Sequence, residues 1–176
     1  MGDTRTMNAA PRLPVSPHCR TCDTIATCPQ YQRAFDPWGP ADWRLSVDHD
    51  RRRLILTCRD RVAGADHQRL TNQLIDAGLW TYGTLVDVST AVCVDLAMRD
   101  IDDGIRFLQR RTRELPLRGP LVVVARHPRV LDYALMCDVA AIGVLPGLRL
   151  VVQSLEEAHA WLDQVQRDHR AASRPD

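Results

Sequence analysis

Residues 83–89 read Gly-Thr-Leu-Val-Asp-Val-Ser, and residues 120–125 read Pro-Leu-Val-Val-Val-Ala. Each stretch holds a short, nearly continuous apolar run that is rich in valine. Strands with one face in water alternate apolar and polar residues, whereas parallel strands covered on both faces read as continuous apolar runs. The two stretches therefore predict central strands of a parallel sheet.

A β-hairpin is predicted upstream of these strands. Trp43, Leu45 and Val47 alternate with polar residues, as in a half-buried strand. The polar run 48–51 supplies a turn, and the apolar segment 54–58 returns as a second strand.

The remaining periodic segments alternate between helix and strand. They are a helix over about 65–77, a helix carrying Ile101 to Leu115, a helix carrying Val130 to Val139, a strand over 148–152, and a last helix that Ser154 and Glu157 open as a capping box. The order β-β-α-β-α-β-α-β-α predicts an α/β fold. Right-handed crossovers then give a single mostly parallel sheet with an N-terminal hairpin and flanking helices.

The first 42 residues differ from the rest in composition. They are rich in Pro, Thr and Asp, and their few apolar residues follow neither helical nor strand periodicity. We interpret 1–42 as an extended arm whose ordered part covers about 18–35, and 43–165 as the α/β domain. Residues 166–176 are predicted to form a polar tail.

Composition limits the classes of function. Hydrophobic residues make up 45% of the chain, as in globular proteins. No run approaches the roughly 20 apolar residues of a membrane span, and the first thirty residues lack the apolar segment of a secretory signal. These features favour a cytoplasmic protein without a membrane span. All 23 basic residues are arginine, which excludes Schiff-base and P-loop lysines, and no basic block predicts nucleic-acid binding.

A cysteine motif in the arm is a candidate metal site. Cys19, Cys22 and Cys28 have the spacing C-x2-C-x5-C, which lets three thiolates converge on zinc or on an iron–sulfur cluster. Both groups normally take four protein ligands. His18 is the nearest candidate for the fourth, and a ligand from the folded domain or from a second chain is equally compatible with the spacing.

Four other residues are interpreted as structural. Cys58, Cys93 and Cys137 lie in or beside apolar runs and are predicted to be small core residues. Asp95 is predicted to cap a helix, because acidic residues are favoured at helix N-termini.

A possible ligand site lies at the ends of the two central strands. Ser89 and Thr90 follow one strand, and Arg126 and His127 follow the other. Open α/β sheets place their ligands outside the carboxyl ends of parallel strands. These four residues are therefore predicted to share the rim of any pocket there.

Three motifs resemble the SpoIIAA-like branch of the STAS-like proteins, small α/β domains of bacteria. Residues 83–89 are similar to the strand that ends in Asp-Leu-Ser in that family. Residues 120–125 match a strand that precedes a loop and helix, and Glu156-Glu157-Ala158 through Trp161-Leu162 is close to the closing "EEA-AWL" segment. The resemblance covers about 43–165 and leaves the cysteine arm outside.

The chain departs from the family at its regulatory turn. In STAS anti-sigma antagonists an Asp-Ser-Ser-Gly turn carries the phosphorylated serine. Asp87 and Asp95 keep the family's eight-residue separation, but residues 96–98 are Leu-Ala-Met. This turn therefore offers no hydroxyl to accept phosphate, and a phosphorylation switch is not expected there.

The resemblance implies a non-enzymatic regulatory or interaction module with a protein partner or self-association. Some related folds bind lipids or other apolar ligands, so a carrier or sensor of a small apolar ligand is the alternative. An enzyme ranks third, because the sequence shows no nucleophile–base pair, P-loop or complete metal triad. A buried apolar cavity would favour the ligand function, and a closed core with an exposed apolar strip would favour the interaction function.

Overall fold

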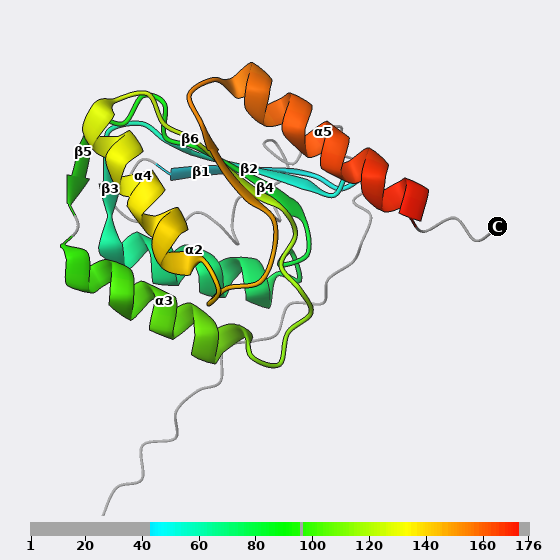
Figure 1. The fold of residues 1–176 in the computed structure, drawn as a ribbon, viewed down its shortest axis with the longest axis horizontal. Coiled ribbons are helices and arrows are strands. Elements are labelled where there is room, and N and C mark those ends of the chain that lie inside the picture. Colours follow the sequence, from blue (N-terminus) through cyan, green and yellow to red (C-terminus); the bar gives the residue numbers. More distant parts are fainter. Residues whose placement is uncertain (1–42, 96, 173–176) are drawn as a thin grey trace, which may run out of the picture.

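A computed structural model describes residues 43–95 and 97–172 of the protein. A five-stranded sheet in the order β1-β2-β4-β6-β7 forms its centre (Figure 1). The strands are β1 (Trp43–Asp48), β2 (Arg53–Cys58), β4 (Gly83–Asp87), β6 (Leu121–Val124) and β7 (Arg149–Val152). β1 is antiparallel to β2 and the other pairings are parallel. The predicted α/β fold, a mostly parallel sheet with an N-terminal hairpin, is confirmed.

In the described part of the chain, helices cover both faces of the sheet (Figure 1). The first face carries α2 (Gly64–Asp76), α3 (Met98–Thr112) and α4 (Pro128–Ala141), and the second carries α5 (Leu155–Ala172). Ser154 caps α5 as predicted, since its hydroxyl accepts a hydrogen bond from the backbone N–H of Glu157 at 3.1 Å. The helix continues to Ala172, so most of the predicted polar tail is helical.

A second, two-stranded parallel sheet pairs β3 (Arg61–Ala63) with β5 (Cys93–Asp95). Neither strand was predicted, because three residues are too few for a periodic pattern. The predicted helix cap at Asp95 is wrong, because this residue lies on β5 and its exposed carboxylate is 3.6 Å from Arg61. The N-cap of α3 is Ala97, whose backbone N–H donates to Asp100 at 2.6 Å.

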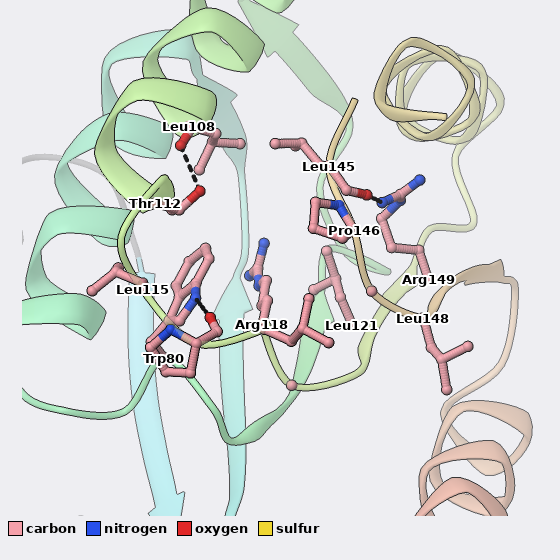
Figure 2. A pocket seen from close by; sticks show the side chains of 14 residues that line it. Trp80, Leu108, Thr112, Leu115, Arg118, Leu121, Leu145, Pro146, Leu148 and Arg149 are labelled. Carbon is pink, nitrogen blue, oxygen red and sulfur yellow. Dashed lines mark hydrogen bonds between the residues drawn. The ribbon is translucent and has the colours of Figure 1, made fainter. Parts of the chain in front are cut away.

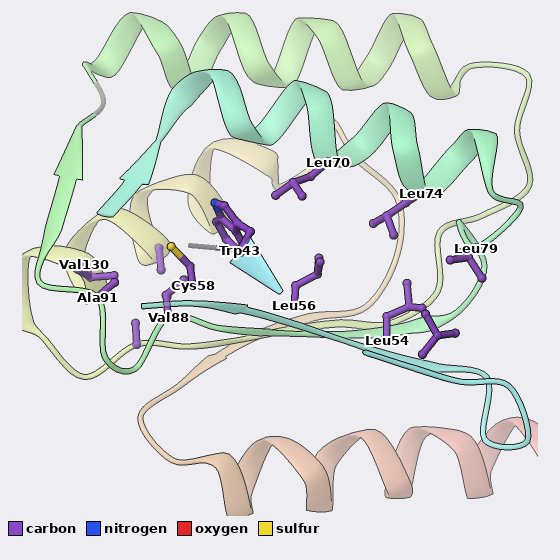
Figure 3. Packing of buried hydrophobic residues seen from close by; sticks show 13 residues of the cluster. Trp43, Leu54, Leu56, Cys58, Leu70, Leu74, Leu79, Val88, Ala91 and Val130 are labelled. Atoms are coloured by element: carbon purple, nitrogen blue, oxygen red, sulfur yellow. The ribbon is translucent and has the colours of Figure 1, made fainter. Parts of the chain in front are cut away.

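Alternate residues of β2 enter two separate cores. Leu54 and Leu56 pack on the side of α2 and α4 (Figure 3), whereas Ile55 packs on the side of α5. Cys58 is fully buried in the first core, as predicted. The same prediction is wrong for Cys93, which is exposed because β5 lies outside the main sheet, and Cys137 is only partly buried.

An ion pair ties α5 to the sheet. Arg53 at the start of β2 is 6% exposed, and its guanidinium donates to Asp163 Oδ1 of α5 at 2.6 Å. The hydrogen bond from Arg53 lowers the pKa of the Asp163 carboxyl. The contribution of this pair to stability is therefore present at neutral pH and is lost as the pH falls through the lowered pKa.

We expect Asp163→Asn to lower the free energy of unfolding by about 1–2 kcal/mol, because a buried guanidinium loses its charged acceptor. The expected loss is at the low end for a charged hydrogen bond, since the Asp163 side chain is 47% exposed and water screens it. Urea unfolding at pH 7 measures the effect. The matched control is Asp168→Asn, on the same helix, where the exposed carboxylate accepts a hydrogen bond from the side chain of Gln164. Equal unfolding midpoints for the two variants would contradict the expectation.

Candidate ligand cavity

A cavity of about 180 Å³ lies between the sheet and the layer formed by α2, α3 and α4. Most of its wall is apolar, with side chains that include Leu56, Leu70, Ile101, Val123, Val130 and Leu150. Gly104 of α3, and Ala134 and Ala141 of α4, also line it. Small residues at these positions explain the space, because large side chains there would reach across to the sheet.

A smaller cavity of about 60 Å³ adjoins the first at the amino ends of β6 and β7 (Figure 2). Both cavities are lined by Leu108, Arg118, Leu121, Leu145 and Arg149. The two spaces therefore meet beside two arginine side chains.

Arg118 is one of the two charged groups at this junction. It belongs to the segment between α3 and β6, and Figure 2 shows its side chain pointing into the cavity. Its guanidinium carbon lies 4.9 Å from the centre of the Trp80 ring, a cation–π contact. The Trp80 indole is itself fixed, because Nε1 donates to the carbonyl of Pro116 at 3.1 Å. Burial, with a smaller effect from Arg149, lowers the pKa of Arg118 to about 10, so the guanidinium is charged at neutral pH.

His67 of α2 lines the larger cavity. The residue as a whole is exposed, and its imidazole lies among the protein atoms that line the cavity. Burial, and then the charge of Arg118, lowers its pKa to about 4, so the ring is neutral at pH 7. A neutral imidazole can donate one hydrogen bond and accept another.

Arg149, Tyr133 and Cys137 of the cavity wall have partners. Arg149 donates to Asp138 Oδ1 at 2.9 Å and to the carbonyl of Leu145. Tyr133 and Cys137 share a hydrogen bond, and burial raises the pKa of both. Among the residues that the structure describes, no carboxylate pairs with Arg118.

The low pKa of His67 predicts acid sensitivity. The unfolded chain binds a proton near pH 6.5 that the folded protein binds only near pH 4. Stability from this group is therefore full above pH 6.5 and falls as the pH drops toward 4. We expect His67→Asn, which cannot titrate, to flatten that part of the pH profile. Urea unfolding of both proteins between pH 7 and 4 measures the difference, and parallel profiles would contradict the expectation.

The predicted rim residues lie together, but away from the cavities. Ser89 and Thr90 follow β4, Arg126 and His127 follow β6, and these strands are hydrogen-bonded neighbours. The Ser89 backbone N–H donates to Asp87, and Arg126 Nε donates to the carbonyl of Gln153. None of the four rim residues lines either cavity. Ligand binding at this rim stays a prediction, and the cavities lie elsewhere.

The predicted metal ligands His18, Cys19, Cys22 and Cys28 lie outside the described residues. Within 43–95 and 97–172, no group of three His, Cys, Asp or Glu side chains could hold a metal ion.

Sequence reasoning missed both His67 and Arg118. The sequence did contain a signal for His67, because it precedes the buried Leu70 and Leu74 at helical spacing and so lies on the same side of α2, although His67 itself is exposed. No comparable signal marks Arg118, which lies in a segment without periodicity.

Fold and cavity define the class: a small α/β domain with a mixed sheet, three helices over a cavity and one helix on the opposite face. A search of solved structures finds an uncharacterized protein of the DUF3478 family from Shewanella loihica PV-4, described as having a SpoIIAA-like fold. The match has 13% sequence identity and a TM-score of 0.45, and it covers 69% of this chain and 93% of that one. SpoIIAA-like is also the fold that the sequence motifs predicted. No protein-family model and no curated protein matches this sequence.

None of the helices in the described part of the chain is both long enough and apolar enough to cross a bilayer.

Proposed function

We propose that the chain is a non-enzymatic SpoIIAA-like module that binds a small apolar ligand, as a carrier or sensor. The observation that supports this function is the cavity of about 180 Å³ beneath α2, α3 and α4. It is the feature that distinguishes the ligand function from a pure interaction function, because a module that only presents a surface needs a closed core.

The physical argument rests on the cost of such a space. Protein interiors are packed about as densely as organic crystals, and a void lined by aliphatic side chains forfeits their dispersion contacts. An apolar ligand restores those contacts and leaves water at the same time. A few polar groups among apolar ones, here His67 and Arg118, are what small-molecule sites use to orient a ligand.

The test is titration of the full-length protein with the neutral fluorescent probe N-phenyl-1-naphthylamine. We expect saturable binding with one site per chain. Gly104→Leu should weaken binding at least about tenfold, because the new side chain enters the cavity. The variant should fold, since leucine is the better helix former and the nearest atom to a Cβ at position 104, His67 Nδ1, is 3.9 Å away; its melting temperature checks this.

Leu135→Ser is the matched control, because this residue of α4 is 45% exposed and lies outside both cavities. It should leave probe binding unchanged. Equal affinity of wild type and Gly104→Leu, or loss of binding in Leu135→Ser, would place the probe on the surface and contradict the proposal.

Interaction with another protein is the second candidate function. The observation in its favour is an apolar strip on α4, where Leu135 and Val139 lie four residues apart and are 45% and 66% exposed, with Ile142 just beyond the helix at 65%. We propose a second copy of the chain as the partner. Sedimentation equilibrium should then show a dimer that Val139→Asp dissociates, and a monomer at all concentrations would contradict it.

We further propose that Cys19, Cys22 and Cys28, with His18 or a ligand from elsewhere, bind zinc or an iron–sulfur cluster. The spacing of the three thiols supports this. Metal content and the optical spectrum of anaerobically purified protein distinguish the two groups, because a cluster absorbs visible light and zinc does not. A serine at any one cysteine should abolish binding, and full alkylation of all three thiols without metal loss would contradict the proposal.

A further inference from the structure

We propose that the cavity ligand is an apolar monocarboxylate whose carboxylate binds Arg118. This inference rests on the proposed ligand function and specifies the chemistry of the ligand. It is carried by a cationic side chain that lines an apolar cavity and has no carboxylate partner among the described residues.

Arg118 and Arg149, the two arginines that line both cavities, differ in their partners. Arg118 is partly buried, and a charged group that loses part of its hydration is destabilised unless a counter-ion or hydrogen-bond acceptors replace the lost water. Arg149 has such partners in Asp138 and the Leu145 carbonyl. For Arg118 the contact found is the face of Trp80, which attracts the cation but accepts no conventional hydrogen bond. The guanidinium therefore lacks an acceptor that a ligand can supply.

Arg118 selects for one negative charge. A planar guanidinium binds a carboxylate through two parallel hydrogen bonds. The contact with Trp80, at 4.9 Å from the guanidinium carbon to the ring centre, holds the charge beside the cavity without supplying a conventional hydrogen-bond acceptor. A dianionic phosphate would bring a second charge, and Arg149 is already neutralised by Asp138. A single carboxylate is therefore the better match.

The position of Arg118 also orients the ligand. It lies where the small cavity meets the large one, so a carboxylate bound there directs an apolar chain toward Leu70, Ile101 and Val123. His67 lines the same cavity and is close enough to Arg118 for that charge to lower its pKa. As a neutral ring, it can donate one further hydrogen bond to the carboxylate.

The test compares decanoate with 1-decanol, which have the same chain length but differ in charge. Isothermal titration calorimetry of the full-length protein at pH 7.5 should show decanoate binding about tenfold to hundredfold more tightly than decanol, as expected for charged hydrogen bonds. Arg118→Met should remove this preference, because decanoate then loses its charged partner and decanol has none to lose. Arg106→Met is the matched control, because Arg106 is an exposed arginine of α3 outside both cavities, and it should retain the preference.

A stability measurement separates ligand binding from a structural role. If Arg118 binds a ligand, its unpaired charge destabilises the ligand-free folded protein. Arg118→Met should then raise the melting temperature without ligand by about 2–4 °C. A structural role predicts the opposite, namely a lower melting temperature.

Each outcome decides between the hypotheses. Decanol binding without a preference for decanoate, or a preference that survives Arg118→Met, would overturn the carboxylate inference and leave the proposed ligand function intact. Binding of neither compound, together with no binding of the neutral naphthylamine probe, would overturn both. A lower melting temperature of Arg118→Met would also overturn the inference.

Discussion

Gly119→Ala is expected to lower the free energy of unfolding by about 3 kcal/mol, at the upper end of the cost of overpacking. A Cβ at position 119 would overlap the backbone carbonyls of Thr81 and Tyr82. Backbone atoms cannot rotate away as a flexible side chain does, so the segment that carries Arg118 has to shift. Urea unfolding measures the loss of stability.

Gly104→Ala is the matched control for this substitution. A Cβ there meets only His67 Nδ1, at 3.9 Å, and the residue lies within α3. Alanine should stabilise the helix by up to about 1 kcal/mol. A Gly119→Ala protein as stable as wild type would show that the close approach of the two segments is not required.

Leu162→Ala is expected to cost about 2–5 kcal/mol, the range for a buried leucine. Leu162 is 2% exposed and packs with Leu85 and Val122 in the core beneath α5. Because α5 is the only described helix on this face, no second helix can move in to fill the space. Thermal and urea unfolding measure the effect.

Leu117→Ala removes the same atoms from a position between α3 and β6 that is 68% exposed, and it should change stability by no more than about 0.5 kcal/mol. A cost for Leu162→Ala as small as that of Leu117→Ala would contradict the account of the α5 core.

The sheet was predictable because its central strands carry their own signal. Residues 85–88 and 121–125 read as continuous apolar runs, and the two segments pair in parallel as that pattern requires. The helices over 64–76 and 128–141 follow from 3.6-residue periodicity. Periodicity was less informative about burial on α4, where Val130 is buried and Val139 is 66% exposed.

The cavity was not predictable, because no single segment encodes it. It arises where Gly104 of α3 and Ala134 and Ala141 of α4 face the same region of the sheet. Small residues on separate helices become one space only through packing. Open α/β sheets bind ligands outside the carboxyl ends of their strands, so the sequence predicted a ligand site there. Arg118 belongs instead to the segment before β6, and so lies at the amino ends of the strands.

The link between Arg53 and Asp163 has a consequence for synthesis on the ribosome. It joins the first hairpin to a helix that lies 110 residues later in the chain. Until α5 emerges, one face of the sheet has no cover, and Leu85, Val122 and Val124 remain in contact with water. A nascent chain arrested before residue 155 therefore presents an apolar sheet surface of the kind that chaperones bind, and the domain closes only after its last described helix leaves the exit tunnel.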